Sequence, residues 1–297
     1  MAYQVFALKY RPQNFDDLVG QEHIVVPLKN AITSGKLHHA FLFAGTRGVG
    51  KTSAARILAK ALNCTQGPTI NPCDKCDSCR QIISGGSLDV LEIDAASQTG
   101  VDDVRVLREN LSYGAMYGKY RIIILDEAHM LSKNAWNALL KVVEEPPEHV
   151  IFIFATTEPS KVMDTILSRV QRYDFKRIIQ QDIKERFKVI LKKEAIEFED
   201  TALTILAQKA EGSMRDGLTL LDQAVAFSGD NKISEASVKK LLGLVESEHY
   251  REIFLLIVNH ESSRVVDSLA KICTKGYDLE EFVYGFYDYL RGLLICS

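Results

Sequence analysis

The feature that most constrains this chain is a glycine-rich octapeptide that follows a short apolar run. Residues 40–44 are apolar, and the next eight residues fit the pattern G-x-x-x-x-G-K-[ST]: Gly45, Thr46, Arg47, Gly48, Val49, Gly50, Lys51 and Thr52. A helix-forming run follows at residues 53–59. Strand, loop and helix in this order predict a phosphate-binding loop. A glycine-rich turn without a ligand is the alternative, but the full pattern with both flanks is rare by chance.

The chemistry of such a loop follows from its residue types. Glycines let the backbone curl so that several N–H groups point inward, and the helix that follows adds its positive end. We expect Lys51 to reach the outer phosphates of a nucleotide and the Thr52 hydroxyl to hold Mg²⁺.

A second apolar run ends in two carboxylates. Residues 121–125 read Arg-Ile-Ile-Ile-Leu and are followed by Asp126 and Glu127. Continuous Ile/Leu runs are typical of parallel strands that are covered on both faces. We expect Asp126 to hold Mg²⁺, directly or through water, and Glu127 to orient the water that attacks the phosphate. Two solvated carboxylates at a strand end are the alternative, which the nearby phosphate loop disfavours.

Strand and helix patterns alternate from about residue 39 to 175, which predicts a five-stranded parallel α/β domain with ligands at the carboxyl ends of its strands. Before it, Pro12 and Gly20 divide residues 1–38 into an extended arm, a turn and a helix. Only helical patterns follow residue 180. We expect a nucleotide-binding domain at 1–178, an all-α lid at 179–243 and the start of an all-α collar segment at 244–297, truncated because its last helix ends without a cap or polar tail.

Four of the six cysteines lie close together, and they are Cys64, Cys73, Cys76 and Cys79. Their spacing, C-x8-C-x2-C-x2-C, brings four thiolates within reach of one ion, and in a reducing compartment such a cluster favours metal over disulfides. The loop has little apolar content, so a metal would supply the stability that a core cannot. We predict a structural Zn²⁺ site, with iron–sulfur ligation or free thiols as alternatives.

Charge and hydropathy restrict the partners and the compartment. The net charge of −3 gives no global basic signature, so DNA would have to meet a local patch or other subunits. The first residues lack a signal-peptide pattern and no apolar run approaches the length of a membrane span. We therefore expect a cytoplasmic chain without a membrane partner.

Together, these motifs resemble the gamma/tau family of clamp-loader ATPase subunits of bacterial DNA polymerase III across essentially the full length of the chain. Beyond the phosphate loop, the resemblance rests on residues 3–5, 9–12, 19–23, 64–79, 126–131, 139–141, 144–149, 155–157, 168–169 and 211–216. It implies the AAA+ fold of P-loop NTPases, with ATP, Mg²⁺ and Zn²⁺ as cofactors.

The resemblance also implies roles for single residues. The adenine and ribose pocket would be lined by Ala7, Tyr10, Arg11, Pro12, Val19 and Val49. Thr157 would be the sensor-1 residue, and Arg215 the sensor-2 residue that reaches the phosphates of its own site. Arg169 would be the arginine finger that completes a neighbouring subunit's site. For Arg169 and Arg215, a surface ion pair is the alternative. Val170 stands where the family commonly has Cys, which leaves the guanidinium unchanged.

The implied function is that of a motor that uses ATP to load the sliding clamp onto primer-template DNA. Its partners would be delta, delta-prime and further gamma/tau copies in a hetero-pentamer; polymerase activity is not expected in this chain. DNA would be held by backbone contacts at the helix after residues 94–97, where Arg105 is available. Gln98 and Gly100 stand where basic residues are often found, which weakens this patch.

Two alternatives remain. One is an ATPase-inactive scaffold like the delta-prime subunit, which the intact Lys51, Thr52, Asp126 and Glu127 disfavour. The other is a different AAA+ motor, such as a branch-migration helicase. The four-cysteine loop and the lack of a winged-helix pattern argue against that motor.

Overall fold

The structure is a computed structural model that describes residues 3–97, 111, 114–229, 232–245, 247–274, 277 and 279–296. The chain forms two compact units. One comprises residues 1–188 with 207–219, and the other comprises residues 189–206 with 220–297. The domain boundaries expected after residues 178 and 243 remain proposals, and each unit is described by itself.

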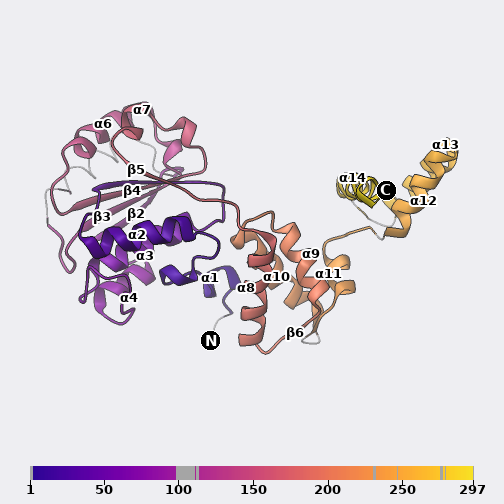
Figure 1. Ribbon diagram of the computed structural model, residues 1–297, viewed down its shortest axis with the longest axis horizontal. Coiled ribbons are helices and arrows are strands. Elements are labelled where there is room, and N and C mark those ends of the chain that lie inside the picture. Colours follow the sequence, from indigo (N-terminus) through magenta and orange to yellow (C-terminus); the bar gives the residue numbers. More distant parts are fainter. Residues whose placement is uncertain are drawn as a thin grey trace. The chain divides into compact units, whose positions relative to one another are not determined.

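A five-stranded parallel sheet forms the centre of the first unit, as the sequence predicted (Figure 1). The strand order is β2-β3-β4-β1-β5. The strands are β1 (Ala40–Ala44), β2 (Val90–Asp94), β3 (Arg121–Asp126), β4 (Val150–Thr156) and β5 (Gln171–Asp174). In register, Ala44 lies opposite Thr156 and Asp94 opposite Asp126. The residues that follow β1, β3 and β4 therefore meet at one edge of the sheet.

Helices cover both faces of this sheet, because strand side chains alternate between the faces. Phe41 and Phe43 of β1 belong to a core with α2 and α3, whereas Leu42 belongs to a core with α6 and α7. The bounds are α2 (Glu22–Ser34), α3 (Lys51–Asn63), α4 (Asp77–Ser84), α6 (Lys133–Glu144) and α7 (Asp164–Leu167). The three layers fix the positions of the carboxyl ends of the strands, where the phosphate loop lies.

Four short helical turns connect the longer elements of this unit. They are α1 (Phe6–Lys9), η1 (Phe15–Asp17), η2 (Ala128–Met130) and η3 (Pro159–Lys161). The prediction of an extended arm is wrong at α1. No glycine or proline interrupts residues 3–9, and the turn buries Phe6, which is 5% exposed. The Asn14 side chain accepts a hydrogen bond from the Asp17 N–H, which starts η1.

The remaining helices lie after residue 179, where the sequence shows only helical patterns. They are α8 (Gln180–Lys193), α9 (Asp200–Lys209), α10 (Met214–Ser228), α11 (Glu235–Leu241), α12 (Ser247–Val258), α13 (Ser262–Thr274) and α14 (Leu279–Cys296). One detail corrects the all-α expectation for the lid: β6 (Glu197–Phe198) pairs in parallel with β7 (Lys232–Ile233). Strands of two residues are too short to show a period of two.

Among the helices that the structure describes, none is both long and apolar enough to cross a membrane.

Candidate functional site

The loop between β1 and α3 has the conformation that its glycines allow. Gly45 has a φ of +151°, and a Cβ there would lie 2.6 Å from the carbonyl oxygen of Phe175. Gly50, the residue before α3, has a φ of +104°. L-residues with a Cβ avoid such positive φ values, so glycine is required at this turn into the helix.

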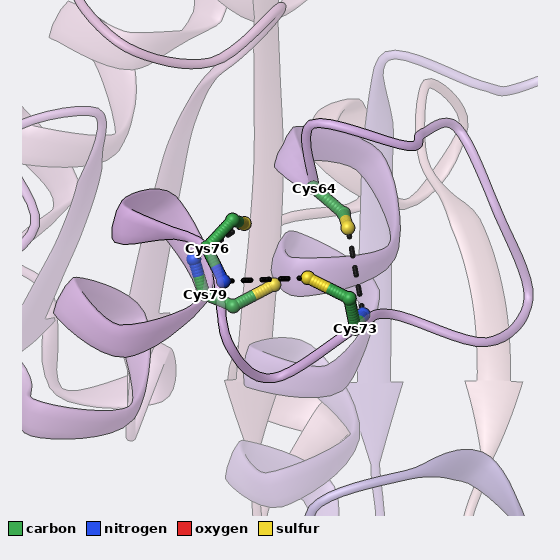
Figure 2. A group of neighbouring side chains, drawn as sticks. All are labelled: Cys64, Cys73, Cys76 and Cys79. Carbon is green, nitrogen blue, oxygen red and sulfur yellow. Dashed lines mark hydrogen bonds between the residues drawn. The ribbon is translucent and has the colours of Figure 1, made fainter.

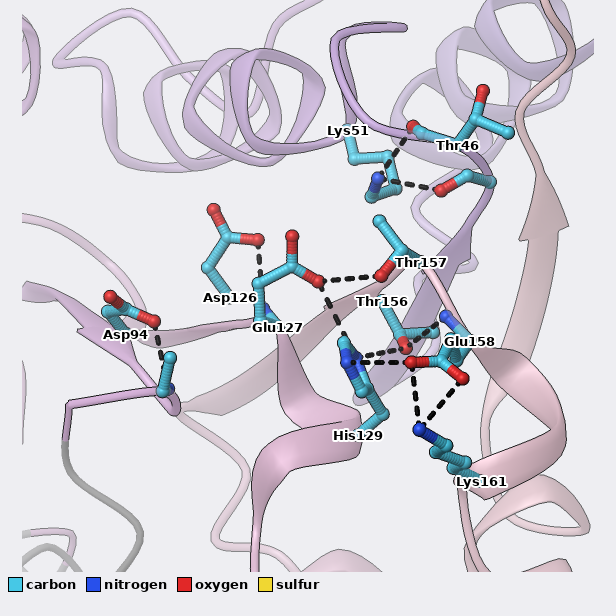
Figure 3. A network of polar contacts seen from close by, with 12 residues as sticks. Thr46, Lys51, Asp94, Asp126, Glu127, His129, Thr156, Thr157, Glu158 and Lys161 are labelled. Atoms are coloured by element: carbon cyan, nitrogen blue, oxygen red, sulfur yellow. Dashed lines mark hydrogen bonds and ion pairs between the residues drawn. The ribbon is translucent and has the colours of Figure 1, made fainter.

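Lys51 is buried inside the loop. The residue is 6% exposed, and its Nζ donates hydrogen bonds to the carbonyl oxygens of Gly45 at 2.7 Å and Thr46 at 2.8 Å (Figure 3). Burial lowers the pKa of Lys51, whereas the carboxylates of Glu127 and Asp126 oppose this shift. Lys51 is therefore a desolvated cation that lies near two carboxylates. Its ammonium group is suited to binding the oxygens of a polyphosphate.

Thr52 and Asp126 meet at the end of β3. The Thr52 Oγ1 hydroxyl donates a hydrogen bond to Asp126 Oδ2 at 2.7 Å. Mg²⁺ prefers hard oxygen ligands and is usually bound in proteins by one or two carboxylates together with substrate phosphates. Two adjacent oxygen donors beside the phosphate loop fit that ion.

Glu127 adopts a strained backbone conformation and contacts the end of β4. Its φ is +46° and its ψ is +44°. Thr157 Oγ1 donates a hydrogen bond to Glu127 Oε2 at 3.0 Å, and His129 Nδ1 lies 3.5 Å from the same oxygen (Figure 3). Left-handed conformations of non-glycine residues are costly and cluster at functional sites. The structure thus brings Thr157, predicted from the resemblance, onto the carboxylate predicted from the strand.

His129 is part of this network, although the sequence assigned it no role in the site. Its Nδ1 lies 3.1 Å from Thr156 Oγ1, and its Nε2 lies 3.4 Å from Glu158 Oε1. The His129 side chain is 7% exposed. No metal-ligand spacing or nucleophile motif surrounds this histidine in the sequence, and its approach to Glu127 depends on the turn η2.

A cavity of about 310 Å³ opens beside the loop, within the unit formed by residues 1–188 and 207–219. It is lined by most of the residues that the sequence analysis assigned to a nucleotide site, namely Ala7, Tyr10, Arg11, Pro12, Val19, Arg47, Gly48, Val49, Gly50, Lys51, Thr52, Asp126, Glu127 and Arg215. Gly45, Thr46 and Thr157 do not line it but contact Lys51 or Glu127.

Further lining residues were assigned no role in the nucleotide site by the sequence, namely Leu8, Asp17, Leu18, Ser53, Ile178, Arg186, Met214, Leu218 and Thr219. Arg11 Nε donates to Ser53 Oγ at 3.3 Å, and within this group Arg186 Nη1 lies 3.4 Å from Asp17 Oδ1. Burial and the charge of Arg56 lower the pKa of Arg11. Apolar residues in a helical pattern predict only that these side chains are buried. The sequence pattern therefore could not show that they line the cavity.

The first turn of α10 touches the phosphate loop. The Arg215 N–H donates to the Gly48 carbonyl oxygen at 3.3 Å, and a Cβ on Gly48 would lie 1.9 Å from Ser213 Oγ. The charge of Arg215 contributes to the lowered pKa values of Lys51 and Arg11. Arg215 thus lines the cavity together with Lys51 and Arg11, whose pKa values it lowers, and with Arg47 and Arg186.

Arg169 is held away from the cavity. Its Nη2 forms an ion pair with Glu144 Oε1 at 2.7 Å, and its Nη1 donates to the Thr165 carbonyl at 2.7 Å and to Ser168 Oγ at 2.9 Å. Its side chain is 38% exposed. The structure therefore does not bring Arg169 to the site of its own chain.

The four cysteines of the 64–79 loop converge at one point (Figure 2). Their sulfurs all lie within 4.8 Å of one another, and backbone N–H groups of Cys73, Cys76 and Cys79 donate to sulfurs of the preceding cysteines. Burial opposes ionisation of Cys76, yet backbone donors lower its pKa to about 6. Four thiolates around zinc would lie about 3.8 Å apart, so this donor set fits the ion with a small contraction.

The residues proposed to face DNA lie outside the described part of the chain. These are Gln98, Gly100 and Arg105. Before them, Asp94 accepts hydrogen bonds from the Ala96 N–H at 2.9 Å and the Ser97 hydroxyl at 2.9 Å.

Comparison of the fold with solved structures identifies its class. Thermotoga maritima RuvB, titled a Holliday junction branch migration motor, superposes with a TM-score of 0.60 at 19% identity over 93% of this chain and 91% of RuvB. At that identity the likeness shows the fold alone, and it agrees with the AAA+ P-loop fold class expected from the sequence.

Comparison of the sequence is more specific. Family models match residues 20–179 (DNA polymerase III, delta subunit), 182–230 (DNA polymerase III clamp loader subunit, ATPase lid domain) and 233–297 (DNA polymerase III subunits gamma and tau domain III).

The sequences of curated relatives point to the same family as these family models. DNA polymerase III subunit tau of Escherichia coli K12 is 46% identical over 94% of this chain and 43% of its own length. The tau subunit of Bacillus subtilis 168 is 45% identical over 99% of this chain and 52% of its own length. The chain thus spans about half the length of these two relatives. Subunit gamma of Buchnera aphidicola subsp. Baizongia pistaciae is 43% identical over 90% of this chain and 72% of its own length. The chain therefore belongs to the gamma/tau family of DNA polymerase III subunits.

Proposed function

We propose that this chain is the ATPase motor subunit of a replicative clamp loader. It would act in the cytoplasm within the DNA polymerase III holoenzyme, where ATP binding and hydrolysis place the sliding clamp on primed DNA. The observation that carries this proposal is the cavity where the phosphate loop, Asp126, Glu127 and Arg215 meet. Delta, delta-prime and further copies of this family are the proposed partners.

The residues at the cavity divide the work by their chemistry. Lys51 and Arg215 bind the phosphates, while the arm around Tyr10 and Arg11 holds the base and ribose. Thr52 and Asp126 would hold Mg²⁺, which supplies charge neutralisation at the phosphates when it is bound. Glu127, oriented by Thr157, accepts a hydrogen bond from water and aims it at the terminal phosphate.

Arg169 acts between subunits in this proposal. Because it lies outside the cavity of its own chain, it is available to stabilise charge on the phosphoryl group bound by a neighbour. Glu144 holds its guanidinium at 2.7 Å, and this pre-orders the side chain. Zn²⁺, held by the four cysteines, would stabilise the 64–79 loop.

The test is steady-state ATP hydrolysis by this chain mixed with the other clamp-loader subunits, with and without clamp and primed DNA. We expect clamp and DNA to raise the rate, and Lys51→Ala and Arg169→Ala each to lower it at least about 10²-fold. Lys239→Ala, which removes an exposed ion pair with Glu235 in α11, is the control and should leave the rate unchanged.

The outcomes separate the two function classes. Hydrolysis by the intact assembly no faster than that of the Lys51→Ala assembly would contradict the motor. The chain would then be an ATPase-inactive scaffold like the delta-prime subunit.

A further inference from the structure

A buried lysine connects the cysteine loop to the arm of the nucleotide cavity. Lys60 lies in α3 and is 1% exposed. Its Nζ donates to the Gln13 carbonyl oxygen at 2.5 Å and to Asp74 Oδ1 at 2.5 Å. A cation this deeply buried is tolerated only when it is paired and hydrogen-bonded, so the arrangement of both partners depends on Lys60.

The Asp74 end of this connection belongs to the cysteine loop. Asp74 lies between Cys73 and Cys76 and has a φ of +55°, a conformation set by the turn that brings the cysteines together. The loop is also fixed to the end of α3, since the Thr69 N–H donates to the Ala61 carbonyl at 2.9 Å. The position of the Asp74 carboxylate therefore depends on the closed form of the loop.

The Gln13 end belongs to the arm. Gln13 directly follows Arg11 and Pro12, which line the cavity, and its Nε2 donates to the Arg11 carbonyl at 3.2 Å. Arg11 in turn donates to Ser53 in the first turn of α3 at 3.3 Å. The arm is thus fixed to α3 at two points, by Arg11 near the phosphate loop and by Gln13 at Lys60.

Helix α3 directly connects the nucleotide cavity to the cysteine loop. It begins at Lys51 and ends at Asn63, directly before Cys64. Lys60 is nine residues beyond Lys51, about 14 Å along the axis. The side chains of α3 that face the core, Ala54, Ala55, Ile57, Leu58 and Ala59 among them, are fully buried, so the helix has little freedom to bend.

We propose that Lys60 and Asp74 are positioning residues through which a metal in the cysteine loop strengthens nucleotide binding. Loss of the metal releases Asp74, which leaves Lys60 without its anionic partner and loosens the arm at Gln13. This inference rests on the proposed ATP-binding function. Because coupling between two sites is reciprocal, bound ATP must also strengthen metal binding by the same factor.

The experiment measures ATP affinity of the full chain, in Mg²⁺, before and after zinc is removed by a pyridine chelator that leaves Mg²⁺ in solution. For the unmodified chain we expect zinc removal to weaken ATP binding about five-fold or more. ATP should raise the affinity of the loop for zinc by a similar factor, measured as the equilibrium competition with the chelator, which a merely structural role would not produce.

Two variants at one position separate coupling from folding. Asp74→Gly removes the carboxylate but accepts the positive φ, so the loop still closes; Asp74→Asn tolerates the same φ and keeps an acceptor oxygen. We expect Asp74→Gly to bind ATP more weakly even with zinc, with less than about two-fold further loss on zinc removal. Asp74→Asn should lie between Asp74→Gly and the unmodified chain.

Lys60→Met should behave like Asp74→Gly in both measurements. Lys239→Met is the control and should behave like the unmodified chain.

The results distinguish this inference from the proposed function. If the zinc-loaded unmodified chain binds ATP with the same affinity after complete zinc release, the coupling is wrong and the ATPase proposal stands. If ATP binds but does not change the equilibrium affinity for zinc, the coupling is also wrong. If the zinc-loaded chain binds no ATP, the proposed function fails together with the coupling.

Discussion

At the scale of single residues, the proposed chemistry depends on Glu127. Its left-handed backbone aims the carboxylate at the cavity, and the Thr157 hydroxyl fixes one of its oxygens at 3.0 Å. We predict that Glu127→Gln, which keeps the size but loses the charge that polarises water, lowers hydrolysis by the assembly about 10²–10⁴-fold. ATP affinity of the same variant, measured by equilibrium titration, should stay within about two-fold.

A substitution of Thr157 tests whether hydrolysis depends on the orientation of the Glu127 carboxylate. Thr157→Val keeps the shape but removes the hydroxyl that donates to Glu127, and hydrogen bonds to charged groups contribute about 1.5–3 kcal/mol. We expect hydrolysis by the assembly to fall about ten-fold or more, with unchanged ATP affinity. Thr204→Val, at an exposed position of α9, is the matched control. A normal rate for Thr157→Val would show that Glu127 needs no orientation by this residue.

At the scale of elements, the contact between the phosphate loop and α10 places Arg215. Gly48 has a φ of +78°, and its Cβ would overlap Ser213 Oγ; Gly35, after α2, has a φ of +67° with open space around it. We predict that Gly35→Ala costs about 1–2 kcal/mol of unfolding free energy without changing ATP affinity. Gly48→Ala should add at least a ten-fold loss of ATP affinity, because the overlap displaces α10 from the loop. Urea unfolding and ATP titration of both variants measure this, and equal affinities would contradict the role of the contact.

The elements also show which parts of the fold were predictable from the sequence. The phosphate loop, the carboxylates after β3 and the cysteine loop carry their chemistry within a few consecutive residues, so pattern and spacing suffice. The parallel strands were equally clear, because burial on both faces produces continuous apolar runs such as residues 122–125.

What the sequence did not predict depends on contacts between distant segments. Ile178 and Arg186 line the cavity because the chain returns to the arm after β5, and nothing local marks them. Lys60 reads as an exposed residue of a helix; its burial depends on Gln13 and Asp74, which come from either side of it in the chain. The arm was predicted as extended because a four-residue helix has no readable period.

At the scale of the whole molecule, the proposed function makes the site of one chain incomplete. Arg169 forms an ion pair with Glu144 and does not line the cavity of its own chain, so as the proposed arginine finger it would act on the site of a second subunit. A head-to-tail interface repeats the same donor and acceptor surfaces around an assembly. Each chain would then give its Arg169 to one neighbour and use its own Lys51 for itself.

This arrangement predicts that two inactive variants restore each other. Arg169→Ala keeps an intact cavity and lacks the finger, whereas Lys51→Ala keeps the finger and lacks the cavity lysine. In an equal mixture within the assembly, about a quarter of interfaces between copies pair an intact cavity with an intact finger. We expect hydrolysis to recover to about that fraction of the unmodified rate, although each variant alone is inactive. A mixture as inactive as its components would mean that Arg169 acts within its own chain, and the assembly would then be unnecessary for the chemical step.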